Sequence, residues 1–254
     1  MAQKTCRLAL EDGTIVTGFS FGADSDTPIS GEVVFNTAMC GYQEALTDPS
    51  YAGQILIMTA PEIGNYGVNN EDVESTKPQV AGFIIKELSR TVSNYRSDKD
   101  LATWLAEHSI PAMDGVDTRA LVRKIRNTGA LRGVLTTDGS ISDESLVEMA
   151  TQSAAMTGKD LASSSTCLQS SEWVEDLGPW NTHDCSKDKK WRVVSLDCGA
   201  KHNIYRHLAS VGCEITSLPN SATASDIRAL SPDGLFVSNG PGDPAAVATT
   251  IATL

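Results

Sequence analysis

Short apolar runs separated by turn residues dominate the first third of the chain and predict β-strands. Cys6 to Leu10 and Thr14 to Phe19 flank the turn Glu11-Asp12-Gly13, where an Asp-Gly pair supplies the positive φ that a hairpin turn requires. Further strands are expected at Glu32 to Asn36, Gln54 to Met58 and Phe83 to Ile85. We therefore expect the first third to be rich in β-structure.

Apolar residues recur with helical spacing from about residue 97. One stripe consists of Leu101, Trp104, Leu105 and His108. Ser97 precedes this stripe and is the expected N-cap of the helix. His108 ends the stripe, which is more typical of a packed side chain than of a catalytic base.

A second helix is expected to begin at Asp117 or Thr118, either of which can cap it, and to turn Leu121 and Ile125 inward. Its outward positions are basic: Arg119, Arg123, Lys124 and Arg126. This face could dock a partner of an acidic protein, although a solvated face is the more common interpretation. Two further elements follow, a strand from Leu131 to Leu135 and a helix capped by Ser142.

Periodicity fades between about Thr151 and Lys190. This segment contains Ser163-Ser164-Ser165, Gly178-Pro179 and the charged run Lys187-Asp188-Lys189-Lys190, which are typical of a linker. Beyond it, strands are expected at Val193 to Leu196, Glu214 to Thr216 and Gly234 to Val237, with helices at Ala200 to Ala209 and Ser225 to Leu230. This alternation predicts a parallel sheet with right-handed crossovers. We expect an α/β protein with domains at 1–152 and 191–254, joined by a linker at 153–190.

Composition and charge narrow the function. The 254 residues carry a formal net charge of -12, which argues against a nucleic-acid surface. The start of the chain has no targeting pattern and no apolar run approaches the roughly 18 residues of a membrane helix, so a cytoplasmic protein is expected. The cysteines are Cys6, Cys40, Cys167, Cys185, Cys198 and Cys213, and the histidines are His108, His183, His202 and His207. Their spacing fits reduced thiols and no metal site.

The stretch Ser-Asn-Gly-Pro-Gly-Asp-Pro at 238–244 is the main candidate for chemistry. It follows the apolar run Leu235 to Val237, where a buried strand would end at the carboxyl edge of the sheet. Two glycines around a proline give a stiff loop with uncovered N–H groups that can receive an anion or a developing oxyanion. By itself, such a cluster is more often an ordinary turn between a strand and a helix, with no binding role.

Longer motifs resemble a known family. They are Gly41-Tyr42-Gln43-Glu44, Leu46-Thr47-Asp48-Pro49-Ser50-Tyr51, Ile63-Gly64-Asn65-Tyr66-Gly67 and Gly115-Val116-Asp117-Thr118-Arg119. In this order they resemble the amino-terminal domain of the carbamoyl phosphate synthetase small subunit. Asp197-Cys198-Gly199-Ala200-Lys201 and the 238–244 loop are similar to the start of that subunit's class I glutamine amidotransferase domain, a doubly wound parallel sheet.

The resemblance implies an enzyme subunit that hydrolyses L-glutamine and passes ammonia to a large synthetase subunit in a heterodimer. That partner uses ATP, Mg and bicarbonate to make carbamoyl phosphate for arginine and pyrimidine synthesis, and the small subunit itself needs no cofactor. By position, Ser50, Gly240 and Gly242 would hold the glutamine, and the Gly240 N–H would help to form the oxyanion hole. Asp48-Pro49-Ser50 is also a common turn sequence, in which the polar side chains cap their own backbone. The residues alone favour this turn without a substrate role.

The catalytic groups of the family are not matched in residues 1–254. The family's nucleophilic cysteine, histidine base and carboxylate lie in sequence that would follow Leu254, so we expect a truncated chain without glutaminase activity. Cys198, with His202 one helical turn further on, is the best substitute nucleophile present. The family usually has an aromatic residue at that position, so a packing role is expected for Cys198.

Two other function classes remain to be weighed. The chain could be a non-catalytic module that docks on the large subunit, and continuation of the reading frame into a Gly-x-Cys-x-Gly turn would eliminate that alternative. A flavodoxin-like nucleotide-binding domain is the other. The turn Asp197 to Lys201 lacks the glycine spacing of a dinucleotide or P-loop site, which argues against it.

Overall fold

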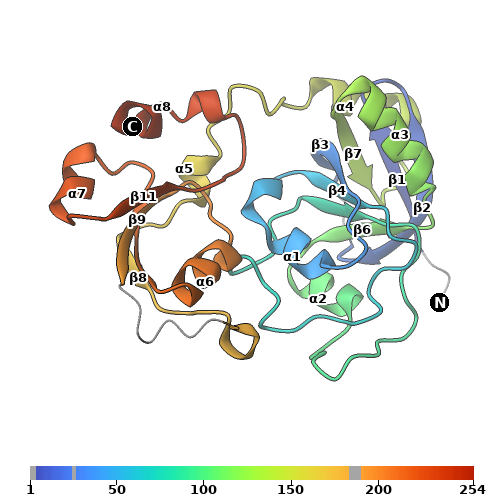
Figure 1. Ribbon diagram of the computed structural model, residues 1–254. Helices are drawn as coiled ribbons and strands as arrows, with labels where there is room; N and C mark the ends of the chain where they lie inside the picture. The colour runs from blue at the N-terminus through green and yellow to red at the C-terminus, as the bar shows by residue number, and fades with distance from the viewer. Residues whose placement is uncertain (1–3, 25–26, 183–189) are drawn as a thin grey trace. The chain divides into compact units, whose positions relative to one another are not determined.

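The computed structural model describes residues 4–24, 27–182 and 190–254. The chain forms two compact units, Met1–Ala155 and Met156–Leu254 (Figure 1). The division falls three residues after the domain end predicted at 152. Within the described residues, no helix is long and apolar enough to cross a membrane.

The first unit is built on a closed β-barrel. Its strands are β1 (Thr5–Leu10), β2 (Ile15–Gly22), β3 (Ile29–Asn36), β4 (Ile55–Met58), β5 (Gly82–Ile84), β6 (Pro111–Asp114) and β7 (Leu131–Thr136). They follow the order β1-β2-β6-β5-β4-β3-β7, and antiparallel pairing of β1 with β7 closes the barrel. The predicted hairpin is confirmed, since β1 and β2 pair antiparallel and Gly13 has a φ of 87°.

Alternate residues of the barrel strands face two different cores. Leu8, Ile55 and Ile84 belong to the inner core, which α3 (Thr118–Thr128) completes with Leu121 and Ile125. Their neighbours point outward and are covered by helices: α4 (Asp143–Gln152) lies over β1 and β7, α1 (Tyr42–Thr47) covers β4 and β5, and α2 (Leu101–Glu107) packs on β2 and β6. Burial on both faces explains why β4 reads as the continuous apolar run Ile-Leu-Ile-Met.

Helix caps follow the predictions in two cases and differ in one. Asp117 caps α3 and Ser142 caps α4, as expected. The prediction that Ser97 caps α2 is wrong. Asp100, the residue directly before the helix, is the cap, and its carboxylate accepts the Thr103 N–H at 2.8 Å. Ser97 instead donates to the Lys99 carbonyl through its hydroxyl. His108 is exposed at the end of α2, where its ring packs against Trp104.

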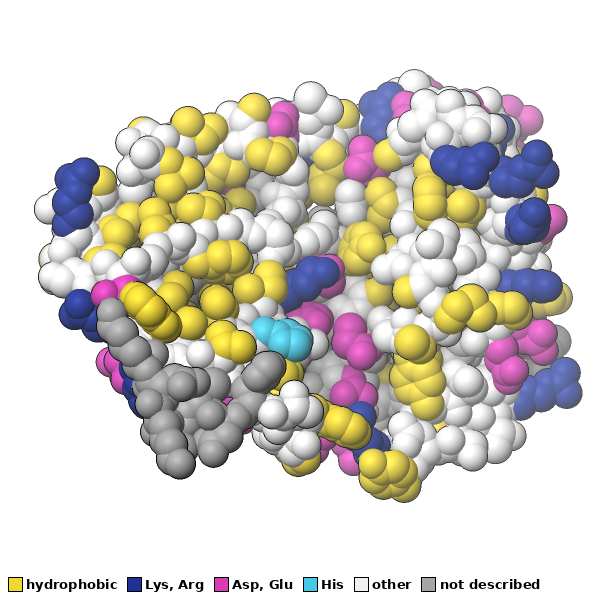
Figure 2. Space-filling model, in the orientation of Figure 1, with side chains coloured by type: hydrophobic (Ala, Val, Ile, Leu, Met, Phe, Trp, Pro, Cys, Tyr) yellow, Lys and Arg dark blue, Asp and Glu magenta, His cyan; other side chains and the backbone are white. Residues whose placement is uncertain are grey.

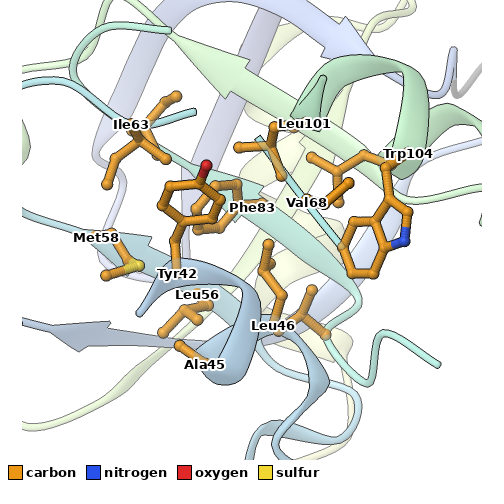
Figure 3. Close-up of a cluster of buried hydrophobic side chains, with 14 of the residues drawn as sticks. Tyr42, Ala45, Leu46, Leu56, Met58, Ile63, Val68, Phe83, Leu101 and Trp104 are labelled. Atoms are coloured by element: carbon orange, nitrogen blue, oxygen red, sulfur yellow. The ribbon is translucent and has the colours of Figure 1, made fainter. Parts of the chain in front are cut away.

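The outer core of the barrel is organised around Tyr42 (Figure 3). Its ring is fully buried, and its hydroxyl donates to the Gly67 carbonyl at 2.6 Å. Tyr66 stacks on it with ring centroids 4.1 Å apart. The Tyr66 hydroxyl accepts the N–H groups of Gly41 and Tyr42 at 2.7 and 3.0 Å, which satisfies the start of a helix that has no side-chain cap of its own.

The second unit contains a sheet of order β11-β9-β10-β8. Its strands are β8 (Ser171–Trp173), β9 (Trp191–Asp197), β10 (Cys213–Pro219) and β11 (Gly234–Val237), and its helices are α5 (Ala162–Ser165), α6 (His202–Ser210), α7 (Ala224–Ala229) and α8 (Ala248–Thr253). β9 pairs in parallel with both β10 and β11, which confirms the predicted parallel sheet.

The segment interpreted as a linker is partly structured. Residues 171–173 form β8, which pairs antiparallel with β10 and so extends the sheet of the second unit. A strand of only three residues with two exposed positions leaves little pattern in the sequence, so it was not predicted. His183, Cys185 and most of the charged run, Lys187 to Lys189, lie outside the described residues.

Replacing Leu56 by Ala tests the outer core. Leu56 is fully buried, so the truncation is expected to lower the free energy of unfolding of the first unit by about 2–5 kcal/mol. Hydrogen exchange of peptides from β4 during urea unfolding measures this loss. Met39→Ala is the control, since Met39 is 73% exposed and its truncation should change stability by about 0.5 kcal/mol or less. Equal effects of the two substitutions would contradict this account of the core.

Candidate functional site

The 238–244 loop begins as a direct extension of the sheet. After β11, the Ser238 N–H donates to the Leu196 carbonyl at 3.1 Å. The Ser238 hydroxyl accepts the Cys198 N–H at 2.8 Å and donates to the Asn239 carbonyl at 2.7 Å. The start of the loop is therefore bound to the turn that follows β9.

Both glycines of the loop lie directly against backbone. A Cβ atom on Gly240 would lie 2.0 Å from the Cys198 carbonyl oxygen. Gly242 has a φ of 85°, and a Cβ there would lie 2.7 Å from the Lys159 carbonyl oxygen. No side chain fits at either position without moving the loop, so each glycine has a packing reason independent of any ligand.

The far end of the loop is tied to the segment before α5. The Asp243 N–H donates to the Lys159 carbonyl at 3.1 Å, and the Asp243 carboxylate accepts the N–H groups of Gly158 and Ala245 at 3.0 and 2.9 Å. These backbone donors lower the pKa of Asp243. The loop is thus held at both ends by hydrogen bonds within the second unit.

The N–H groups of Gly240 and Gly242 are not used by this anchoring. Within residues 4–24, 27–182 and 190–254, neither N–H donates a hydrogen bond. A rigid loop with unused N–H donors has the property required of an oxyanion-binding element. The assignment of Gly240 to the oxyanion hole and of Gly242 to glutamine binding stays a prediction.

The turn after β9 is organised by Asp197. One of its carboxylate oxygens accepts the N–H groups of Gly199 and Ala200 at 2.9 and 2.8 Å, and the other accepts the Cys167 N–H at 2.6 Å. This carboxylate is therefore used to shape the approach to α6 and to hold the segment after α5. No sequence argument assigned it that role, although Asp-x-Gly-Ala after a buried strand is a common capping pattern.

Cys198 has the surroundings of a packed residue. It is 7% exposed, lies against Ala162 and Val247, and its Sγ is 3.9 Å from the Thr250 hydroxyl. Burial raises the pKa of its thiol, which disfavours the thiolate that a nucleophile requires. His202, its proposed base, packs its ring against Trp173 at 5.0 Å, and burial lowers the pKa of that imidazole. These contacts support the packing interpretation.

Ser50 lies in the first unit, in the short 3-10 helix Pro49–Tyr51. Asp48 caps this helix by accepting the Ser50 N–H at 2.9 Å. The turn chemistry expected from Asp48-Pro49-Ser50 is therefore present. The Ser50 side chain is half-buried in this turn. Its role in holding glutamine stays a prediction.

The second unit is an α/β fold with parallel strands and a glycine-rich turn at the carboxyl edge of its sheet. Residues 194–254 match the family model of "Glutamine amidotransferase class-I". Residues 8–135 match that of "Carbamoyl-phosphate synthase small chain, CPSase domain". The chain belongs to the family of carbamoyl phosphate synthase small chains, as its motifs predicted.

Relatives agree over nearly the whole chain. The carbamoyl phosphate synthase small chain of Rhodopirellula baltica is 48% identical over 95% of this chain and 64% of its own length. That of Syntrophotalea carbinolica is 47% identical over 93% of this chain and 63% of its own length. The chloroplastic small chain of Oryza sativa subsp. japonica is 48% identical over 98% of this chain and 55% of its own length. The chain thus spans less than two thirds of each of these relatives.

A Gly240→Ala substitution tests the packing of the loop. The added Cβ must displace the Cys198 backbone, so we expect the second unit to lose about 1–3 kcal/mol of stability. Amide hydrogen exchange should accelerate in peptides covering 197–200 and 238–244. Gly234→Ala is the matched control, because a Cβ at Gly234 has no atom within 4 Å. Unchanged exchange in the Gly240 variant would show that the loop is not fixed by this contact.

Proposed function

We propose that this chain is part of the glutamine-hydrolysing subunit of a carbamoyl phosphate synthase, which supplies ammonia to a large synthetase subunit. The observation that carries the proposal is the consecutive match of both units to the two domains of that family. The anchored loop with unused Gly240 and Gly242 N–H groups supports it, because amide hydrolysis needs fixed donors for the oxyanion.

The proposed chemistry is acyl transfer through a cysteine. A thiolate attacks the side-chain carbonyl carbon of glutamine, and the Gly240 N–H stabilises the oxyanion that forms. Cleavage of the C–N bond, with protonation of the leaving nitrogen, releases ammonia and leaves a thioester. Water then hydrolyses the thioester to glutamate and restores the thiol. The resemblance assigns the cysteine, its histidine base and the orienting carboxylate to a part of the family that residues 1–254 do not match.

The remaining features of the proposal concern the whole enzyme. The large subunit would use ATP, Mg and bicarbonate to form carbamoyl phosphate for arginine and pyrimidine synthesis, and the small subunit would need no cofactor of its own. We propose a heterodimer in a reducing compartment such as the cytoplasm. Free thiols at Cys6, Cys40, Cys167 and Cys198 support that compartment.

Ser50→Ala in the holoenzyme tests the glutamine-binding assignment. Loss of a hydrogen bond to the substrate is expected to raise the KM for glutamine about tenfold or more. Carbamoyl phosphate formation from added ammonia should be unchanged, because it bypasses the glutamine site. Ser93→Ala, at an exposed serine of the same unit, serves as the control. An unchanged KM for glutamine in the Ser50 variant would refute the assignment.

The second test is ammonia release from glutamine by residues 1–254 alone. We expect no turnover above a protein-free control, because Cys198 is buried as a thiol and its Sγ contacts Thr250. A Cys198→Ser variant should give the same result. Turnover that disappears in the Cys198→Ser variant would reverse this conclusion and make Cys198 the nucleophile.

A further inference from the structure

The first unit contains an open cleft beside α3 that the proposed chemistry does not use. Its volume is about 1060 Å³. It is lined by the outward face of α3, the preceding loop 114–117, and residues near 59–61 and 86–87. In Figure 2, Lys and Arg side chains gather over the part of the first unit where α3 lies in Figure 1.

One side of the cleft is a row of arginines. Arg119, Arg123 and Arg126 follow one another at i, i+4 and i+7 on α3, and Lys86 lines the same cleft. All four side chains are exposed, and within the described residues none of these side chains makes a hydrogen bond or an ion pair. Other cations of this unit do find carboxylates: Arg7 binds Asp143, Arg96 binds Asp72, Lys124 binds Asp12 and Arg132 binds Glu11. The four cations of the cleft outnumber the three acidic residues of its lining, so the cleft carries a small positive charge in a chain of net charge -12.

The rest of the lining is apolar and acidic. Phe19, which is 46% exposed, and Val122 both line the cleft. The acidic residues of the lining are Glu87, Asp114 and Asp117.

This mixture fits a polypeptide better than a small anion. The arginine row extends over about 10 Å along the helix, at 1.5 Å per residue, which is longer than one phosphate group. Arginine and aromatic side chains around an apolar centre are typical of protein interfaces.

We propose that this cleft docks a carboxylate-rich segment of the large synthetase subunit. Carboxylates of that segment pair with Arg119, Arg123 and Arg126, and an apolar side chain covers Phe19. The inference rests on the proposed function, because that function supplies the partner.

The test compares binding of the purified large subunit to this chain and to an Arg123→Glu/Arg126→Glu variant. Both residues point outward from α3, so the variant should unfold at the same temperature as the parent chain. We expect its dissociation constant to rise about tenfold or more, mainly through slower association. Association of the parent chain should slow as salt rises from low to physiological concentration, and the variant should show less of this dependence.

Two further variants make the result specific. Arg123→Lys/Arg126→Lys keeps the positive charge and is expected to bind within a fewfold of the parent chain. Arg90→Glu reverses an exposed charge of the same unit outside the cleft and is expected to bind like the parent chain.

Each contrary outcome has a distinct meaning. Equal affinity and equal salt dependence of the parent chain and the Arg123→Glu/Arg126→Glu variant would overturn the docking site and leave the proposed function standing. No binding of the large subunit by the parent chain would overturn both. Binding of inorganic pyrophosphate that the double reversal abolishes, with partner binding unchanged, would replace the docking site by a small-anion site.

Discussion

The pairing of β1 with β7 is the interaction on which the first unit depends. It joins residues from the two ends of the domain, with Leu8 opposite Leu135 and Leu10 opposite Gly133. Closing the sheet removes its edges and encloses the inner core. A closed wall can bury only one side of each strand in its interior. The outer side must be covered by connecting segments, which is why α1, α2 and α4 are needed.

The strand directions determine where those connections lie. β3, β4, β5 and β6 pair in parallel, and parallel neighbours require crossovers instead of tight hairpins. The motifs that contain Gly41, Ser50 and Tyr66 all occur in these crossovers. These crossovers cover the barrel through residues such as Tyr42. They also place short segments such as the 3-10 helix Pro49–Tyr51 on the outside of the barrel. In this unit, the same segments cover the barrel and carry the candidate site residue Ser50.

Local sequence patterns predicted most helices and strands. They could not predict which distant strands pair with each other. The Asp-Gly hairpin, the caps Asp117 and Ser142, and the strand at Gly234 to Val237 each depend on residues within a few positions of one another. Barrel closure depends on Arg7 lying opposite Thr136, which no local pattern specifies. Ser97 failed as a cap because Asp100, closer to the apolar stripe, offers a stronger acceptor to the Thr103 N–H. The loop at 238–244 was recognised from its residues, but its anchoring to Gly158 and Lys159 required the structure.

The 238–244 loop contacts residue 198 mainly through the backbone atoms of that residue. Ser238 binds the N–H of Cys198, and Gly240 lies on its carbonyl group, while the Sγ atom turns away toward Thr250. The Sγ atom of Cys198 therefore lies away from Gly240, and only its Cβ would be close to a side chain at 240. Room for a larger side chain at 198 depends on the side chains of Ala162 and Val247, which can repack. At position 240 the limit is set by the backbone of residue 198, which cannot move aside without displacing the turn, so two neighbouring positions are constrained by different kinds of atoms.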